Sequence, residues 1–260
     1  LLFLEQAYES DPEGLWTPLE LAWALRQSDE SRSQTLVSRA QARLAGDASV
    51  SPSDRACLQR RIRLLEGEAL LLRGQLPVLD SLLPALMEEA SEAGDAQALA
   101  DAHWLGFGLA SLRGAHAEVT AQLQAAVAAS DADPLRRLIF QAELARSEAF
   151  LNNVSAERSW AGRLPAVDVT LPQAAMAVLC DYHGVLAALR ADYGPCMSWF
   201  AQGFEASMAT GQVRRAVTLA SNLGFNHGNM NQYEPALEWL QRGLELARRC
   251  GWQPLIGGCL

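Results

Sequence analysis

The sequence predicts an all-α fold, a right-handed superhelical solenoid built from antiparallel helix pairs. The main observation is an internal repeat, in which eight residues between Leu179 and Gly211 recur between Leu219 and Gly251. Each copy contains a tryptophan and a Tyr-x-Pro triplet. Average amino-acid usage would give only about two matches over such a window. A period of about 40 residues is typical of stacked helix pairs.

The composition supports helices and excludes several functions. Half of the residues are hydrophobic (50%), and alanine and leucine dominate over β-branched residues, which favours helix over strand. The net charge of −9 argues against binding to nucleic acid or to anionic membranes. All 21 basic residues are arginine, so a Schiff-base lysine and a Walker-type phosphate loop are excluded.

The cysteines and the hydropathy pattern indicate a cytoplasmic protein. The five cysteines form no C-x-x-C pair and no group with histidine that has metal-ligand spacing. We expect them to be reduced and mostly buried. No apolar run reaches the length of a membrane span, which is about 18 residues, and no secretory signal is visible.

The first third of the chain predicts amphipathic helices separated by turn-forming residues. Asp11-Pro12 ends the first helix, a polar turn spans residues 28–31, and Gly74 ends the longest helix of this part. Ser53 or Asp54 is expected to cap that long helix at its N-terminus. The helices are expected at residues 1–9, 15–27, 32–44, 54–73 and 76–93.

The repeat continues through the middle of the chain, because Leu72-Arg73-Gly74 recurs as Leu112-Arg113-Gly114 with the same spacing. A degenerate repeat follows, in which Asn152-Asn153 is expected to separate two helices. Trp160 would then correspond to Trp199, one position short of the repeat spacing. The helices are expected at residues 96–112, 115–129, 135–151 and 156–163, and residues 164–171 are expected to form a loop.

Both ends of the chain are expected to fall inside repeats. The chain opens on Leu1 without an initiator methionine, and residues 253–260 are expected to begin one more helix. We therefore expect residues 1–260 to form a single helical repeat domain cut from a longer protein, with about six repeats of which the first and last are incomplete.

The repeat resembles the tetratricopeptide repeat (TPR). The resemblance rests on Leu223-Gly224 in the first helix of a repeat and on Tyr233, Ala236, Leu240 and Leu244 in the second. The period here, about 40 residues, is longer than that family's period of roughly 34 residues. Such lengthened repeats resemble those of large bacterial regulators, including maltose-activator-type transcription factors and the N-terminal regions of GGDEF-type diguanylate cyclases.

Small and aromatic residues of the repeat have separate expected roles. Small residues at Gly203, Gly243 and Ala236 are expected to let neighbouring helices approach closely. The large rings are expected to fill the space between layers of helices. These rings belong to Tyr193, Trp199, Tyr233 and Trp239.

The resemblance also implies that the first helix of each repeat lines a concave groove. Counting from Gly184 and Gly224, and extending the register upstream, selects polar, aromatic and aliphatic residues, and polar groups beside aromatic rings are suited to binding a peptide. The residues selected for this groove are Ser221, Asn222, Phe225, Asn229, Asp181, Tyr182, Val185, Leu189, Glu143, Arg146, Phe150, Trp104 and Leu105.

The sequence predicts no catalytic, cofactor or metal site. The four histidines, His103, His116, His183 and His227, belong to no metal-binding motif, although His183 and His227 lie on consecutive first helices. No nucleophile elbow or glycine-rich phosphate loop is present. Arginine pairs, such as Arg136-Arg137 and Arg214-Arg215, are interpreted as charges at helix C-termini or as partners of carboxylates about four residues away.

Two functions remain open. The first is a non-enzymatic interaction module of a bacterial signalling or transcription-regulatory protein, which binds a protein or peptide partner, or a second copy of itself, through the groove. The alternative is a sensor domain that holds a small-molecule effector in the superhelix, against rings such as Trp104, Tyr182 and Phe225. A closed pocket with convergent polar groups would favour the sensor, and an open groove would favour a peptide or protein.

Overall fold

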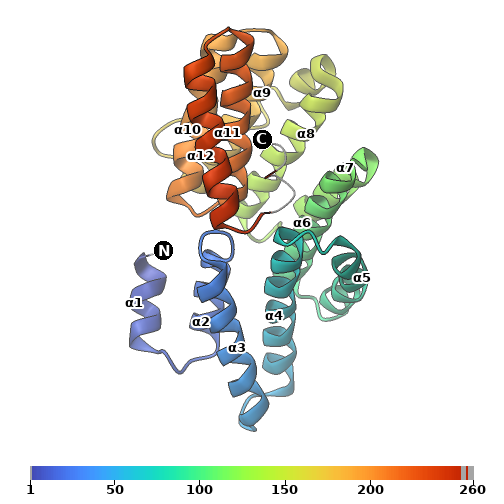
Figure 1. The fold of residues 1–260 in the computed structure, drawn as a ribbon. Coiled ribbons are helices and arrows are strands. Elements are labelled where there is room, and N and C mark those ends of the chain that lie inside the picture. Colours follow the sequence, from blue (N-terminus) through green and yellow to red (C-terminus); the bar gives the residue numbers. More distant parts are fainter. Residues whose placement is uncertain (1, 253–255, 257–260) are drawn as a thin grey trace.

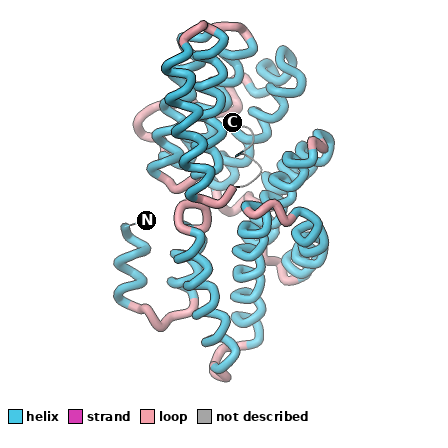
Figure 2. The backbone as a smooth tube through the Cα atoms, in the orientation of Figure 1, coloured by secondary structure: helices cyan, strands magenta, loops and turns pink. Residues whose placement is uncertain are grey.

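The chain folds into helices that pack one after another along the sequence (Figure 1). The structure is a computed structural model that describes residues 2–252 and 256, with the side chains of residues 152–156 left out. Helices and loops make up the whole of this part of the chain, without a strand (Figure 2). The helices are α1 (Leu2–Ser10), α2 (Trp16–Leu25), α3 (Glu30–Gly46), α4 (Pro52–Leu72), α5 (Leu76–Glu92), α6 (Ala96–Arg113), α7 (His116–Ala128), α8 (Pro134–Trp160), α9 (Gln173–Leu189), α10 (Tyr193–Ala209), α11 (Val213–Asn229) and α12 (Tyr233–Arg249).

Short polar side chains set where several helices begin. Asp29, Asp95 and Asp133 each accept a hydrogen bond from the backbone N–H three residues later, at the starts of α3, α6 and α8. The prediction that Ser53 or Asp54 caps α4 is wrong. The cap is Ser51, whose Oγ accepts from the N–H of Asp54, because proline occupies the first position of α4 and needs no partner there.

The repeat of the sequence is also a repeat of the backbone. The bounds of α9 and α10 recur, shifted by one repeat, as the bounds of α11 and α12. Left-handed residues recur with the same spacing: Ala191 and Asn231 follow the first helices, and Gly211 and Gly251 follow the second. Gly74 and Gly114 show the same relation nearer the N-terminus. The backbone of these helix pairs therefore follows the repeat of the sequence.

Glycines allow the two helices of each C-terminal pair to approach closely. A Cβ atom on Gly184 would lie 2.4 Å from the ring of Phe200, and one on Gly224 would lie 2.6 Å from Cγ of Leu240. Phe200 and Leu240 are themselves equivalent positions of the repeat. Gly203 fills the expected role as well, because its Cβ would lie 3.2 Å from the Cβ of Cys180 on the neighbouring helix.

The prediction that four aromatic rings fill the space between layers of helices is only partly confirmed. Trp199 and Trp239 are half-buried, but Trp199 lies beside His183 whereas Trp239 meets Phe204 edge-on. Tyr233 is 67% exposed, so it does not fill space between helices as predicted. Its hydroxyl donates to Asn231 instead, at the turn between α11 and α12.

The predicted break at Asn152-Asn153 is absent, and α8 runs without interruption from Pro134 to Trp160. Asparagine is only a modest helix breaker, and neither glycine nor proline follows it here. Trp160 therefore lies at the end of a single long helix and does not match Trp199. Its indole N–H donates to Glu148 on the same helix.

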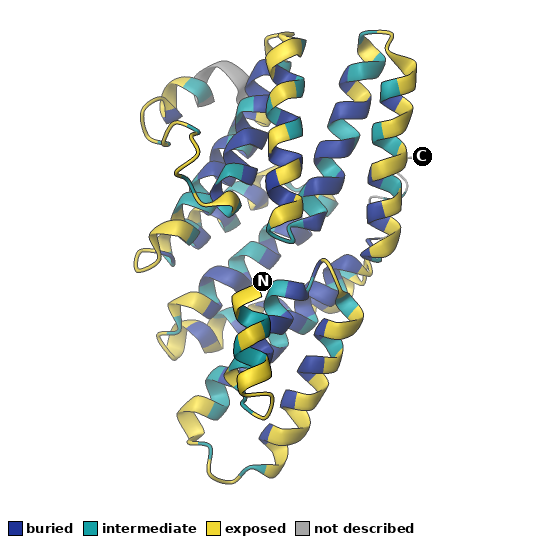
Figure 3. Cartoon of the chain, turned by 90° about the vertical axis from the view of Figure 1, so that its left-hand side faces the viewer, coloured by how far each residue is buried: buried dark blue, intermediate teal, exposed yellow. Residues whose placement is uncertain are grey.

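The buried residues form stripes along the helices that face neighbouring helices (Figure 3). The largest apolar cluster joins residues from Leu72 to Trp252, and two further clusters hold α2 to α6 together. The helices described here include none that is long and apolar enough to cross a membrane. The helix expected at residues 253–260 falls almost entirely outside the described part of the chain.

The N-terminal and C-terminal parts of the chain meet at the turn after α2. The side chain of Gln27 accepts a hydrogen bond from the backbone N–H of Arg214, 187 residues away. The same side chain donates to Glu68 of α4 over 2.8 Å. In Figure 1 this turn lies against the lower ends of α11 and α12. The turn after α2 therefore connects α4 to the start of α11.

Candidate functional site

A cavity of about 480 Å³ lies where the N-terminal and C-terminal helices meet. Its wall combines the C-terminal end of α2, the inner faces of α6 and α8, the first turns of α9 and α11, and residues after α10 and α12. Most of its polar lining consists of arginine and carboxylate side chains. Together with Glu20, Arg61 and Glu68, which lie outside the lining, these side chains form three clusters, which we name by their acidic residues.

The Glu68 cluster joins α2, α4 and α11. Glu68 is fully buried and lies 3.2 Å from Nε of Arg214 and 3.8 Å from Nε of Arg26. Gln27 adds a hydrogen bond to the same carboxylate. Burying a carboxylate is costly unless charged or hydrogen-bonded partners compensate it. Two guanidinium groups share this one carboxylate, so the cluster carries an excess positive charge.

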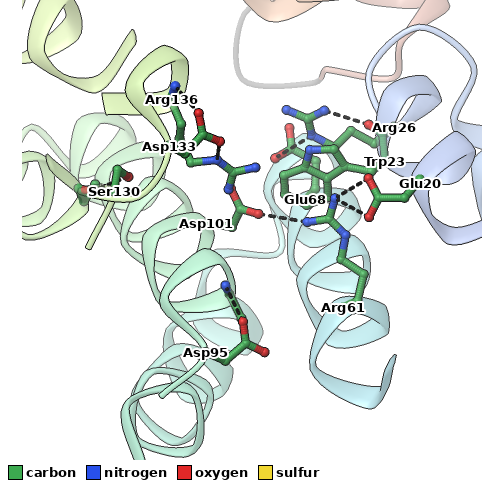
Figure 4. A network of polar contacts seen from close by, with 12 residues as sticks. Glu20, Trp23, Arg26, Arg61, Glu68, Asp95, Asp101, Ser130, Asp133 and Arg136 are labelled. Atoms are coloured by element: carbon green, nitrogen blue, oxygen red, sulfur yellow. Dashed lines mark hydrogen bonds and ion pairs between the residues drawn. The ribbon is translucent and has the colours of Figure 1, made fainter. Parts of the chain in front are cut away.

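In the Asp101 cluster two guanidinium groups again share one buried carboxylate. The buried carboxylate of Asp101 lies between Arg61, at 2.8 Å, and Arg136, which it also contacts directly (Figure 4). Two more carboxylates complete the cluster at its edge: Glu20 contacts Arg61, and Asp133 contacts Arg136. The side chains of Glu20 and Asp133 are 42% and 52% exposed, so water screens their charges.

The third cluster contains two buried carboxylates, Glu143 and Asp181, with Arg146 and Arg215 between them. Burial opposes ionisation of Glu143, but the guanidinium groups of Arg146 and Arg215 outweigh it and lower the pKa of Glu143 to about 2. Burial dominates at Asp181 and raises the pKa of that carboxyl group, with a smaller contribution from the Glu143 charge. Two similar groups are thus shifted in opposite directions within one cluster.

An aromatic wall faces these charges. Trp104 stacks on Phe140, with ring centroids 5.2 Å apart, and also contacts Phe107. Trp23 lies in the wall as well, but guanidinium groups cover its ring: Arg26 lies 4.1 Å and Arg61 4.0 Å from the ring centroid. Cation–π contacts of this kind are worth about 0.5–2 kcal/mol and favour Arg26 and Arg61 staying in place.

Several buried polar atoms of this wall have no hydrogen-bond partner among the described residues. Two of them, Nε1 of Trp252 and Oδ1 of Asp181, belong to residues of the lining and have no ion-pair partner either, whereas Nε of Arg26 and Nε of Arg214 lie in ion pairs 3.8 Å and 3.2 Å from carboxylate oxygens of Glu68. Buried polar groups are normally paired, so each such atom requires an explanation. The N–H of Trp252 and Oδ1 of Asp181 are the lining atoms whose hydrogen bonding a ligand or water molecules would complete.

The structure brings four of the sequence-predicted groove residues together at this cavity: Trp104, Glu143, Arg146 and Asp181. Tyr182 instead packs into the largest apolar cluster, with its ring beside His183. The other principal groove residues lie on α11 outside the cavity lining. These are Ser221 and Asn222, which are half-buried, and Phe225 and Asn229, which are exposed.

The remaining residues that were predicted to line the groove also lie in different environments. Leu105 and Val185 are buried in apolar clusters, whereas Phe150 and Leu189 are exposed. The residues expected to line one continuous concave surface therefore lie partly in the cavity wall, partly in the core and partly on the surface.

The arginine pairs were the functional signal that the sequence interpretation missed. Arg136 and Arg214-Arg215 lie in the first turns of α8 and α11, so their expected place at helix C-termini is wrong. Arg136 does pair with a nearby carboxylate, Asp133, three residues away. Arg215 instead contacts Asp181 and Glu143, which are 34 and 72 residues distant. A guanidinium group in a first turn is unfavourable next to the helix dipole, and carboxylates from other helices offset this effect.

The described residues contain no group of three histidine, cysteine, aspartate or glutamate side chains arranged to hold a metal ion. His183 and His227 do not meet: His183 stacks against Trp199, and His227 contacts Gln232. Cys180, Cys196 and Cys250 are buried free thiols, and burial raises the pKa of Cys180 and of Cys196 to about 11. Thiols of this kind are poor nucleophiles. Cys259 lies outside the described residues.

Comparisons of the chain with models of known protein families and with curated proteins found no match.

Proposed function

We propose that this chain is a non-enzymatic regulatory module that binds a small molecule in the cavity between its N-terminal and C-terminal helices. The observation that carries the proposal is the cavity wall, which combines three arginine–carboxylate clusters with the ring of Trp104. Its volume of about 480 Å³ lies in the range of small-molecule sites, which is about 300–1,000 Å³. Unpaired buried polar atoms in such a wall support a ligand-binding role.

The contacts around Gln27 favour a small molecule over an extended peptide. Because Gln27 ties the end of α2 to the start of α11, the cavity has walls from both parts of the chain. An extended peptide requires a groove that is open along its length. A ligand that contacts both walls would stabilise one arrangement of the two parts over others, which is how a sensor transmits binding.

The wider setting belongs to the same proposal. The recurrence of helix bounds at the repeat spacing supports the stacked helix pairs of a superhelical, TPR-like solenoid. The resemblance to lengthened repeats of bacterial regulators suggests a place within a cytoplasmic signalling or transcription-regulatory protein. Free, buried cysteines are consistent with that compartment.

A second candidate function, binding of a protein or peptide partner, is favoured by exposed apolar residues near the turn between α11 and α12. Phe225, Tyr233 and Leu237 are 68%, 67% and 56% exposed and lie within two helical turns of that connection. Exposed apolar patches rimmed by polar residues mark interaction sites, and Asn222 and Asn229 neighbour Phe225 on α11. This surface is separate from the cavity.

A thermal-shift screen against a metabolite library that contains anionic, neutral and cationic compounds tests the proposed function. A ligand at about 100 times its Kd should stabilise the protein by about 2.7 kcal/mol and raise the Tm. The shift should be lost in Trp104→Ala, which removes the ring of the cavity wall. Trp16→Ala, at a half-exposed position outside the cavity, serves as the matched control and should keep it.

If no compound of the library raises the Tm, the cavity is rejected as a ligand site. The second candidate then has its own test, in which Phe225→Asp and Leu237→Asp should abolish recovery of a protein partner that wild type retains. Recovery of that partner by both variants would reject the α11–α12 surface.

A further inference from the structure

Helix α12 is covered on fewer sides than α10, its counterpart in the preceding helix pair. Helix α10 packs between α9 and α11, whereas α12 packs mainly on α11. Figure 1 shows α12 at the outside of the C-terminal helices. One face of α12 is therefore open among the described helices.

The internal repeat shows how much cover α12 lacks. On α10, Phe204 is fully buried, and Trp239 and Arg242 of α12 lie against its ring. The equivalent residue of α12, Leu244, is only half-buried. Three further apolar positions of α10 recur on α12, and each is also more exposed there. The four pairs, with the residue of α10 first, are Tyr193 and Tyr233, Met197 and Leu237, Phe200 and Leu240, and Phe204 and Leu244.

The four open positions lie along one side of α12. They are separated by four, three and four residues, which places them in a single row on a helix. The same alternation of three and four residues is the spacing of the seam between two packed helices. Such a row of exposed apolar residues marks a surface that a partner covers. We call it the α12 stripe; its residues are Tyr233, Leu237, Leu240 and Leu244.

A row of polar side chains runs beside the α12 stripe. Glu234, Gln241 and Arg248 follow one another at intervals of seven residues, so they lie on the same side of the helix. Glu234 belongs to the first turn of α12 and Arg248 to the last turn. Both are exposed, and neither side chain has an ion-pair partner among the described residues. The stripe therefore has an acidic end and a basic end.

This pattern is complementary to itself when a second α12 runs in the opposite direction. A two-fold axis near Gln241 brings Glu234 of each copy to Arg248 of the other copy, so that two ion pairs form. The same axis brings Leu237 of each copy close to Leu244 of the other. A contact of this kind is isologous, which is the commonest symmetry of protein dimers. A parallel alignment would instead place Glu234 against Glu234.

We propose that the α12 stripe is a dimer interface, in which α12 packs antiparallel on α12 of a second copy of this chain. The inference rests on the second candidate function, since it names the partner of the surface that contains Tyr233 and Leu237. The four residues of the α12 stripe lie outside the cavity lining, so dimerisation does not require a ligand in the cavity.

Sedimentation equilibrium of the whole chain tests the dimer. One helix face buries less area than a standard interface, so wild type should dimerise with a Kd of about 10 µM. Leu237→Asp should weaken the dimer by at least about tenfold, because it places a charge in an apolar seam. Val78→Asp on α5 is the matched control, since Val78 and Leu237 are both 56% exposed, and it should dimerise as wild type does.

Exchange of charges tests the antiparallel orientation. Glu234→Arg and Arg248→Glu should each weaken the dimer by about tenfold, because like charges then meet at two places. The double variant restores both ion pairs and should return the Kd to within about threefold of the wild-type value. These side chains are exposed, so the substitutions should leave the fold intact. Glu118→Arg, at an exposed position of α7, is the control and should not change the Kd.

The outcomes separate this inference from the second candidate function. A wild-type chain that stays monomeric up to about 100 µM, ten times the expected Kd, overturns the second copy as partner. If that monomer recovers another protein through Phe225 and Leu237, the second candidate function stands without the dimer. A dimer that Leu237→Asp leaves intact also overturns the inference, because the contact then lies elsewhere. Growth beyond the dimer would indicate a heterologous contact and would overturn it as well. Failure of the double charge variant to restore the dimer overturns the antiparallel arrangement.

Discussion

At the scale of single residues, Glu143 shows how a buried charge is stabilised in this protein. Its carboxylate accepts hydrogen bonds from Nε of Arg146, at 2.7 Å, and from Nη2 of Arg215, at 2.6 Å. These contacts lower its pKa to about 2 although the side chain is buried. Removing one partner of a buried ion cluster is costly, because the remaining charges stay buried without compensation.

Glu143→Gln should therefore lower the free energy of unfolding at pH 7 by about 3 kcal/mol, measured by urea denaturation. Since the folded pKa lies below the ordinary value of 4.5, the stabilisation is fully present above pH 4.5 and is lost as the pH falls towards 2. The difference between wild type and variant should shrink over the same range. Glu118→Gln, at an exposed position, is the control and should leave stability nearly unchanged.

His183 gives a pH dependence in a different range. Partial burial lowers its pKa from the usual 6.5, because its imidazole packs against Tyr182 and Trp199. A depressed folded pKa means that the stabilisation is present above pH 6.5 and is lost as the pH falls below it. Urea denaturation between pH 7 and pH 5 should show a flatter decline for His183→Gln than for wild type. Identical slopes would mean that His183 is not the responsible group.

At the scale of elements, the close approach of paired helices depends on single glycines. Gly184 on α9 faces the ring of Phe200 on α10, and Gly224 on α11 faces Leu240 on α12. Because Phe200 is buried and Leu240 is half-buried, these side chains have little room to move when the facing glycine gains a methyl group.

Gly184→Ala should reduce the free energy of unfolding by about 1–3 kcal/mol, the range for overpacking in a well-packed core. Gly228→Ala is the matched control, because Gly228 also lies in a helix but a Cβ atom there meets nothing within 4 Å. It should be neutral or stabilise by up to about 1 kcal/mol, since alanine favours helix. Equal effects of the two substitutions on the urea midpoint would contradict the close packing at Gly184.

Helix α8 shows why element bounds were harder to predict than the repeat. Asn152-Asn153 provides a turn signal, yet the helix continues to Trp160. Asparagine costs a helix well under 1 kcal/mol, about 0.7 at most, so packing decides whether the helix ends there. The repeat at residues 135–163, which the sequence analysis describes as degenerate, therefore contains one long helix in place of the two expected helices.

At the scale of the whole molecule, Gln27 connects parts of the chain that are far apart in sequence. Its amide donates to Glu68 and accepts from the backbone N–H of Arg214. Arg214 in turn pairs with Glu68 across the same junction. The cavity exists only while these helices remain together, because its wall draws on both sides.

Gln27→Leu should lower the free energy of unfolding by about 2 kcal/mol, since it removes one hydrogen bond from the buried carboxylate of Glu68 and the side-chain acceptor of the backbone N–H of Arg214. Amide hydrogen exchange at Arg214 should become faster as the junction opens more often. Gln202→Leu, on the exposed face of α10, is the control and should change stability by no more than about 0.5 kcal/mol. Unchanged exchange at Arg214 in the Gln27 variant would show that this contact does not hold the two parts together.

The sequence alone determined the helical class, the repeat and most helix ends. These properties are local: a cap such as Asp29, a left-handed glycine such as Gly114, or an apolar stripe acts through neighbours a few residues away. Periodic local signals can therefore be recognised without coordinates.

Only the tertiary structure decided which charges meet. Glu68, Asp101 and Arg214 have ordinary surroundings in the sequence, and nothing local indicates that their partners lie on helices far away along the chain. Trp104, Glu143, Arg146 and Asp181 were selected by register, but Arg26, Arg136 and Arg214 were not. Ion pairing depends on distances of a few ångströms between side chains of different helices. Those distances are set by how the helices pack and curve around the cavity.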